Sequence, residues 1–134
     1  MNREAAIEWL RLASHNLRGA EILYEAGHYT DTIGCELQQA IEKVLKAIPA
    51  YRNEKILRTH DLYRLFTELD IVELTEEEED LLALATQYLK EERYPNPNYE
   101  LPPREEIAQV LRFAEKLYGK ICDEIGIDPN EIEG

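Results

Sequence analysis

Apolar side chains recur every three or four residues along most of this chain, and this spacing constrains the fold more than any other feature. In a helix such residues share one face, which must be buried against another element. The first stripe predicts a helix over residues 3–26, ended by Gly27, and the longest stripe predicts one from about Pro102 to Ile125. The two stripes are Leu10, Ala13, Leu17, Ala20 and Tyr24, and Ile107, Val110, Leu111, Ala114, Leu117, Tyr118, Ile121 and Ile125.

Three more helices are predicted between these two. One covers residues 29–48 and is stopped by Pro49, and a short one begins at Thr59 as its N-cap. Thr75 and Glu78 form a capping box that opens a fourth helix, which ends near Arg93. No segment has the alternation of a strand, so the sequence predicts an all-α, up-and-down bundle of four to five helices over residues 1–126. The acidic tail, residues 127–134, has no pattern and is predicted to be disordered.

The net charge of −13 opposes general binding of nucleic acid, which needs a cationic surface. The charge is uneven, however: residues 1–72 carry 9 Lys and Arg against 11 Asp and Glu, whereas residues 73–134 carry 6 against 17. Between Lys43 and His60 the balance becomes positive, so the sequence predicts that an anion could bind there.

The remaining composition indicates a soluble, cytoplasmic protein. Cys35 and Cys122 lie far apart inside helical patterns, as is typical of small core residues in a reducing compartment. No apolar run approaches the length of a membrane span, and no spacing predicts a metal site or a cofactor.

Three blocks carry a family resemblance. The segment Gln38–Ala47, the residues Thr59-His60-Asp61-Leu62 and the residues Arg93-Tyr94-Pro95 occur in the order found in HEPN (higher eukaryotes and prokaryotes nucleotide-binding) domains. With the helical pattern around them, the chain resembles this family from about Glu4 to Ile125. The resemblance implies a helical bundle that binds nucleotide or RNA. It also implies a partner, a minimal nucleotidyltransferase in a two-component, toxin–antitoxin-like system.

Five residues are the candidates for binding an anionic ligand: Lys46, Arg58, His60, Arg93 and Tyr94. They flank breaks between predicted helices, and we expect them at one pole of the bundle, where a free helix N-terminus could add N–H donors. Four of the five have a structural alternative. His60 could support its turn, Lys46 could form a surface ion pair with Glu42, Arg93 could cap the preceding helix, and Tyr94 could pack on the bundle.

Many HEPN proteins resemble ribonuclease toxins, in which four to six residues separate an arginine from a following histidine near the last helices. This pattern is missing, because His60 is the last histidine in the chain. Arg52 is one residue too far from His60 for that spacing. The sequence therefore predicts no catalytic residue and leans against an enzyme. The alternatives are a ribonuclease that pairs Arg52 or Arg93 with His60, and a non-catalytic dimeric adaptor.

A homodimer is also predicted. Four apolar residues of the first helix fall outside its main stripe, and an exposed patch of this kind usually marks an interface. They are Trp9, Leu12, Ile22 and Leu23.

Overall fold

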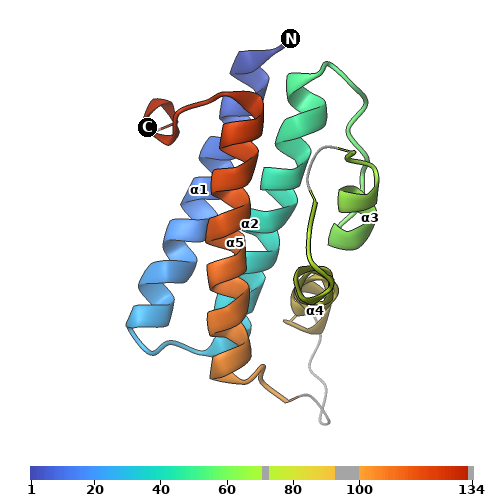
Figure 1. Ribbon diagram of the computed structural model, residues 1–134. Coiled ribbons are helices and arrows are strands. Elements are labelled where there is room, and N and C mark those ends of the chain that lie inside the picture. Colours follow the sequence, from blue (N-terminus) through green and yellow to red (C-terminus); the bar gives the residue numbers. More distant parts are fainter. Residues whose placement is uncertain (71–72, 93–99, 133–134) are drawn as a thin grey trace.

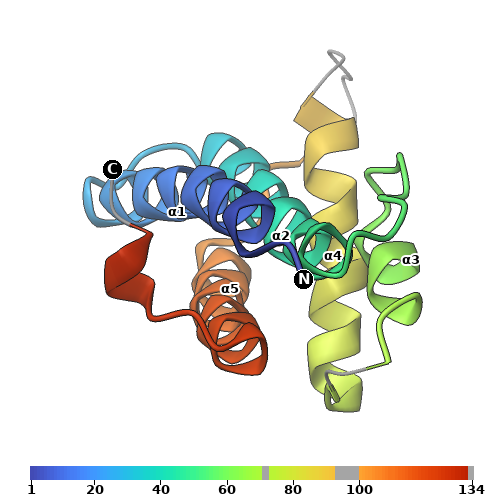
Figure 2. The ribbon, with the colours of Figure 1, turned by 90° about the horizontal axis from the view of Figure 1, so that it is seen from above.

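The computed structural model describes residues 1–70, 73–92 and 100–132, and over these residues the protein is an all-α bundle without strands. Three long helices lie side by side: α1 (Arg3–Glu25), α2 (Thr30–Tyr51) and α5 (Arg104–Ile125) (Figure 1). Helix α4 (Glu76–Glu92) runs across them, and the short α3 (Leu62–Thr67) lies beside it (Figures 1 and 2). The predicted all-α bundle is confirmed.

Helices α1 and α2 form an antiparallel hairpin because only a short turn joins them. Gly27 takes a φ of 70° directly after the C-cap of α1, as expected for a residue without a side chain. On α1 the residues Ala6, Ala13 and Ala20 recur every seven positions and are completely buried. Small side chains at this spacing allow α2 to approach α1 closely along its whole length.

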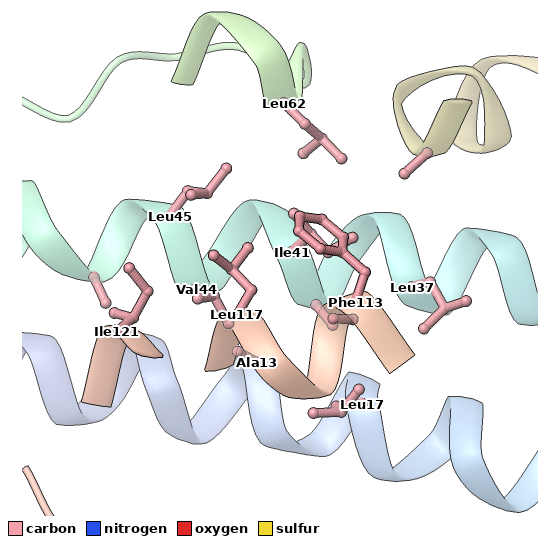
Figure 3. Packing of buried hydrophobic residues seen from close by; sticks show 14 of the residues in the cluster. Ala13, Leu17, Leu37, Ile41, Val44, Leu45, Leu62, Phe113, Leu117 and Ile121 are labelled. Atoms are coloured by element: carbon pink, nitrogen blue, oxygen red, sulfur yellow. The ribbon is translucent and has the colours of Figure 1, made fainter. Parts of the chain in front are cut away.

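The core lies where α1, α2 and α5 meet. Ala13 and Leu17 of α1, Val44 of α2, and Leu117 and Ile121 of α5 gather between the three helices (Figure 3). Leu45, the next residue of α2, instead points toward α3, near Leu62 (Figure 3). Helix α2 is therefore buried on two sides, with α1 and α5 on one and α3 and α4 on the other.

The crossing of α2 and α4 requires glycine at position 34. A Cβ placed on Gly34 would lie 2.9 Å from Cγ of Tyr88, which is closer than packed atoms approach. On its other side Tyr88 donates a hydrogen bond from its hydroxyl to Glu106 Oε2 at 2.6 Å. Tyr88 thus connects α4 to both α2 and α5.

The predicted helix ends agree with the structure at some positions and differ at others. The capping box of α4 is confirmed, with Thr75 N–H to Glu78 Oε1 at 3.0 Å and Glu78 N–H to Thr75 Oγ1 at 3.1 Å. Helix α2 does not stop at Pro49 but continues to Tyr51, so the loss of the single N–H donor of Pro49 does not end the helix. The N-cap of α3 is Asp61 rather than Thr59, which instead accepts a hydrogen bond from the Asp61 N–H.

Residues 127–132 differ from the predicted disordered tail. Ile127 and Ile132 are 2% and 1% exposed, and a 3-10 turn, η1 (Pro129–Glu131), lies between them. Arg11 Nε donates to the Ile132 carbonyl at 3.2 Å, and Arg3 pairs with Glu131. Two isolated isoleucines give no periodic signal, which is why the sequence pattern missed this segment.

The apolar patch predicted on α1 is smaller than expected. Leu12 and Ile22 are exposed, whereas Trp9 and Leu23 are half-buried and pack against the core. None of the helices in the described part of the chain combines the length and the apolar character needed to cross a membrane.

A carboxyl pair between α1 and α5 should make stability depend on pH. A hydrogen bond with Glu21, partial burial and the charge of Glu21 raise the pKa of Glu115 to about 7, against an opposing effect of Arg112. A raised pKa in the folded state adds stability at low pH that is lost as pH rises toward 7. We expect Glu115→Gln to raise the melting temperature at pH 8 but not at pH 5, measured by circular dichroism. An equal shift at both pH values would contradict this.

Candidate functional site: a buried glutamate that holds an exposed histidine

Helix α2 carries three buried polar residues, each one helical turn after the last. Gln38, Glu42 and Lys46 are 0%, 6% and 8% exposed, and their spacing of four residues places them on one face of the helix. This face points toward the segment between α2 and α3, residues 52–61. Burial of polar groups is costly unless they are hydrogen-bonded, so the partners of these three residues define the site.

The Glu42 carboxylate is the centre of the network. Its Oε1 accepts from Gln38 Nε2 at 3.1 Å and lies 2.7 Å from His60 Nδ1, and its Oε2 accepts from Lys46 Nζ at 3.0 Å. Gln38 also donates to the backbone carbonyl of His60 at 3.1 Å. The network therefore fixes both the ring and the backbone of His60 against α2.

Glu42 remains ionised despite its burial. Burial alone would raise its pKa, but hydrogen bonds from His60, Lys46 and Gln38 outweigh burial and hold the pKa of Glu42 below its ordinary value. An ionised carboxylate can only accept, so His60 Nδ1 carries the hydrogen of their contact.

The orientation of His60 follows from this bond. With Nδ1 donating to Glu42, Nε2 is the ring nitrogen left for other contacts. The His60 side chain is 64% exposed, and no further hydrogen bond to it occurs among the described residues. A buried carboxylate therefore presents an oriented imidazole to solvent, an arrangement suited to binding a phosphate oxygen or to moving a proton.

Lys46 has a different role from the one expected. Its pair with Glu42 is not a surface pair, because the two side chains are 10% and 7% exposed. Its Nζ also lies 5.8 Å from the centre of the Trp9 ring, within the range of a cation–π contact. Lys46 is thus a buried partner of Glu42, and its charge is neutralised within the protein.

The structure brings together part of the predicted five-residue site. Lys46 and His60 meet at Glu42, and the exposed Arg58 lies two residues before His60. Arg93 and Tyr94 lie outside the described residues, so their part in the site stays a prediction.

The position of His60 also differs from the predicted pole. Glu42 precedes the end of α2 at Tyr51 by about two and a half turns. The 52–61 segment must therefore run back along α2 before α3 begins (Figure 1).

Sequence reasoning missed Gln38, Glu42 and Trp9 as members of the site. The available signal was a polar residue every four positions beside an apolar stripe, which predicts either a solvated edge or a buried network. Lys43 shows the same ambiguity: its Nζ lies 2.6 Å from Asn16 Oδ1 of α1, and Asn16 donates to Glu36 at 2.9 Å. Only the packing of α1 and of the 52–61 segment against α2 decides whether such a polar residue is exposed or buried.

Metal ligation has no support in the described residues, where no group of three or more His, Cys, Asp or Glu side chains could hold an ion.

Comparison with known proteins identifies the family of this chain. The crystal structure of TT1696 from Thermus thermophilus is similar, with 28% identity, a TM-score of 0.76, and coverage of 93% of this chain and 99% of that chain. ST0689, described as an archaeal HEPN homologue, is similar in fold, with 17% identity, a TM-score of 0.69, and coverage of 91% and 98%. No curated protein matches. The HEPN domain model matches residues 6–125, and this chain therefore belongs to the HEPN family.

Proposed function

We propose that this HEPN chain is a cytoplasmic, non-catalytic module that binds a nucleotide or a short stretch of RNA. The observation that carries the proposal is the oriented, exposed imidazole of His60 beside the cations of the 52–61 segment. Arg52, Lys55 and Arg58 lie within this segment, where Glu54 is the only acidic residue before Asp61. The Arg58 guanidinium supplies donors for phosphate oxygens and can bind two at once. The imidazole Nε2 donates to a phosphate oxygen when the ring is protonated on both nitrogens.

The acidity of the rest of the chain limits the size of the anionic ligand. A net charge of −13 repels a long polyanion, whereas a short one can be held where cations gather. Lys46 does not contribute, because Glu42 neutralises it. The proposed ligand groups are therefore Arg58 and His60, with Arg93 and Tyr94 added if they lie near.

The partners in this proposal are a second copy of the chain and a minimal nucleotidyltransferase. The exposed Leu12 and Ile22 on α1 support a homodimer, since exposed apolar side chains are covered at interfaces. The nucleotidyltransferase follows from the resemblance to two-component systems. Co-expression with a short nucleotidyltransferase encoded beside this gene, followed by size-exclusion chromatography, tests this partner.

Binding can be tested with charge-removing variants. We expect Arg58→Ala to weaken the binding of a short, labelled single-stranded RNA by about tenfold, the effect of losing one hydrogen bond between charged groups. His60→Ala should also weaken the binding of this RNA. Fluorescence anisotropy at fixed salt measures both.

The matched control is Arg18→Ala, which removes a cation of α1 that is paired only weakly with Glu21 at 3.7 Å. It should leave RNA binding nearly unchanged. Equal losses from Arg58→Ala and Arg18→Ala would show that binding depends on overall charge, and the proposed site would then be wrong.

A ribonuclease is the second candidate, and the contact between Glu42 and His60 favours it. A carboxylate on Nδ1 is how an imidazole is oriented as a general base. If the wild-type chain cleaves RNA and His60→Ala does not, the chain is an enzyme. Intact RNA after incubation with the wild type supports the binding module.

A further inference from the structure

A cavity of about 350 Å³ lies between the C-terminal part of α2, the 52–61 segment and α3. Its apolar lining is entirely aliphatic, comprising Leu45, Pro49, Leu57, Leu65 and Leu69. Leu45 is the residue of α2 that points toward α3 (Figure 3). The size is at the lower end for ligand sites, so the cavity suits a small metabolite.

Three charged residues complete the lining: Glu54, Lys55 and Glu68. All three are exposed, and none forms an ion pair or a side-chain hydrogen bond within the described residues. This contrasts with Glu42 and Lys46, whose charges satisfy each other. The rim therefore offers two carboxylates and one ammonium group that are available to a ligand.

These features select a chemical class. Nucleobases are usually held by stacking on aromatic side chains, and no aromatic residue is among those lining this cavity. Aliphatic walls instead match a branched aliphatic body. A rim with both signs of charge matches a ligand that carries an ammonium and a carboxylate group.

We propose that this cavity binds a free α-amino acid with a branched aliphatic side chain, such as leucine. The side chain lies against Pro49 and Leu57, the half-buried aliphatic residues of the lining. The ammonium group contacts Glu54 and Glu68, and the carboxylate contacts Lys55. This site differs from the proposed RNA site, because Glu42, Arg58 and His60 do not line the cavity, although Lys55 belongs to the 52–61 segment used in both proposals.

Isothermal titration calorimetry with L-leucine and three analogues tests the proposal. Isoamylamine lacks the carboxylate, 4-methylpentanoate lacks the ammonium group, and glycine lacks the side chain. We expect leucine to bind saturably and each analogue to bind about tenfold more weakly or worse, since each loses a charged contact or the apolar burial.

Two variants assign the contacts. Lys55→Gln should weaken the binding of leucine by about tenfold and leave the binding of isoamylamine unchanged. Glu68→Gln should weaken the binding of leucine and leave the binding of 4-methylpentanoate unchanged. Both residues are exposed, so the fold should survive, which circular dichroism checks. Glu105→Gln, an exposed change on α5 outside the cavity, is the matched control and should bind leucine like the wild type.

Three results would overturn the proposal: no saturable heat with leucine, equal binding of leucine and 4-methylpentanoate, or unchanged leucine binding in both variants. Methyl NMR shifts of Leu45, Leu57 and Leu65 on addition of leucine give an independent check on the wild-type chain. Glu68→Gln should bind RNA like the wild type. The leucine proposal and the RNA-binding proposal can therefore fail independently of each other.

Discussion

Replacing Glu42 by alanine is expected to lower the free energy of unfolding by about 3–5 kcal/mol, the usual result of removing one partner of a buried ion pair. The Lys46 amine would lie at 10% side-chain exposure without its carboxylate partner. Gln38 and His60 would lose an acceptor in the same step. Urea denaturation followed by circular dichroism measures the change.

Two comparisons separate the buried charge from general damage to the helix. Glu8→Ala, an exposed change on α1, should cost less than about 1 kcal/mol. The double variant Glu42→Leu with Lys46→Leu should recover much of the loss, because an apolar pair needs no compensating charge. A double variant as unstable as Glu42→Ala would contradict this explanation.

The same residue gives a pH signature. A depressed pKa in the folded state adds stability above the ordinary pKa of a carboxyl, and this stability is lost as pH falls through the folded value. The wild type should therefore lose stability on acidification more steeply than the Glu42→Leu, Lys46→Leu double variant. Glu115 instead lowers stability as pH rises toward 7, so the effects of the two carboxyl groups can be distinguished by their pH range and their sign.

Removing the segment after Gly126 is expected to cost about 4 kcal/mol, roughly the loss of two buried isoleucines at about 2 kcal/mol each. Ile127 and Ile132 are nearly inaccessible, so their removal exposes the apolar surface of the helices beneath them. Ile132→Ala alone should account for about half of the effect. Thermal and urea denaturation of both variants measures it.

The matched control is Glu131→Gln, which breaks the ion pair with Arg3. Both side chains of this pair are almost half exposed, so we expect a loss below about 1 kcal/mol. A loss from Glu131→Gln that equals the loss from Ile132→Ala would show that charge rather than apolar burial holds the segment.

The sequence predicts the helices well because their signals are local. The stripes of α1 and α5, the capping box at Thr75 and the glycine after α1 depend on residues within a few positions of one another. The errors occur where a distant segment decides the outcome. Helix α2 continues past Pro49 to Tyr51, whose carbonyl accepts a hydrogen bond from the distant Asn2 N–H at 2.6 Å. Ile132 is buried as part of the core cluster.

The candidate site shows the same division. His60 could be selected because a histidine side chain is suited to proton transfer and because it lies at a helix start, and both are local properties. Glu42 could not, because its spacing to Lys46 is the same for an exposed and a buried pair. Only the path of the 52–61 segment back along α2 makes this glutamate the centre of a network.

Glycine at position 34 allows the position of α4 to be changed without replacing any residue of the candidate site. Any side chain at this position would push Tyr88 outward, and α4 would have to move with it or lose its hydrogen bond to Glu106. Thr86, which accepts from the Leu62 N–H at 3.1 Å, lies on the same helix and would be displaced too. Alanine, serine and valine at position 34 would therefore form a graded series that shifts the start of α3, two residues after His60, without altering a charge.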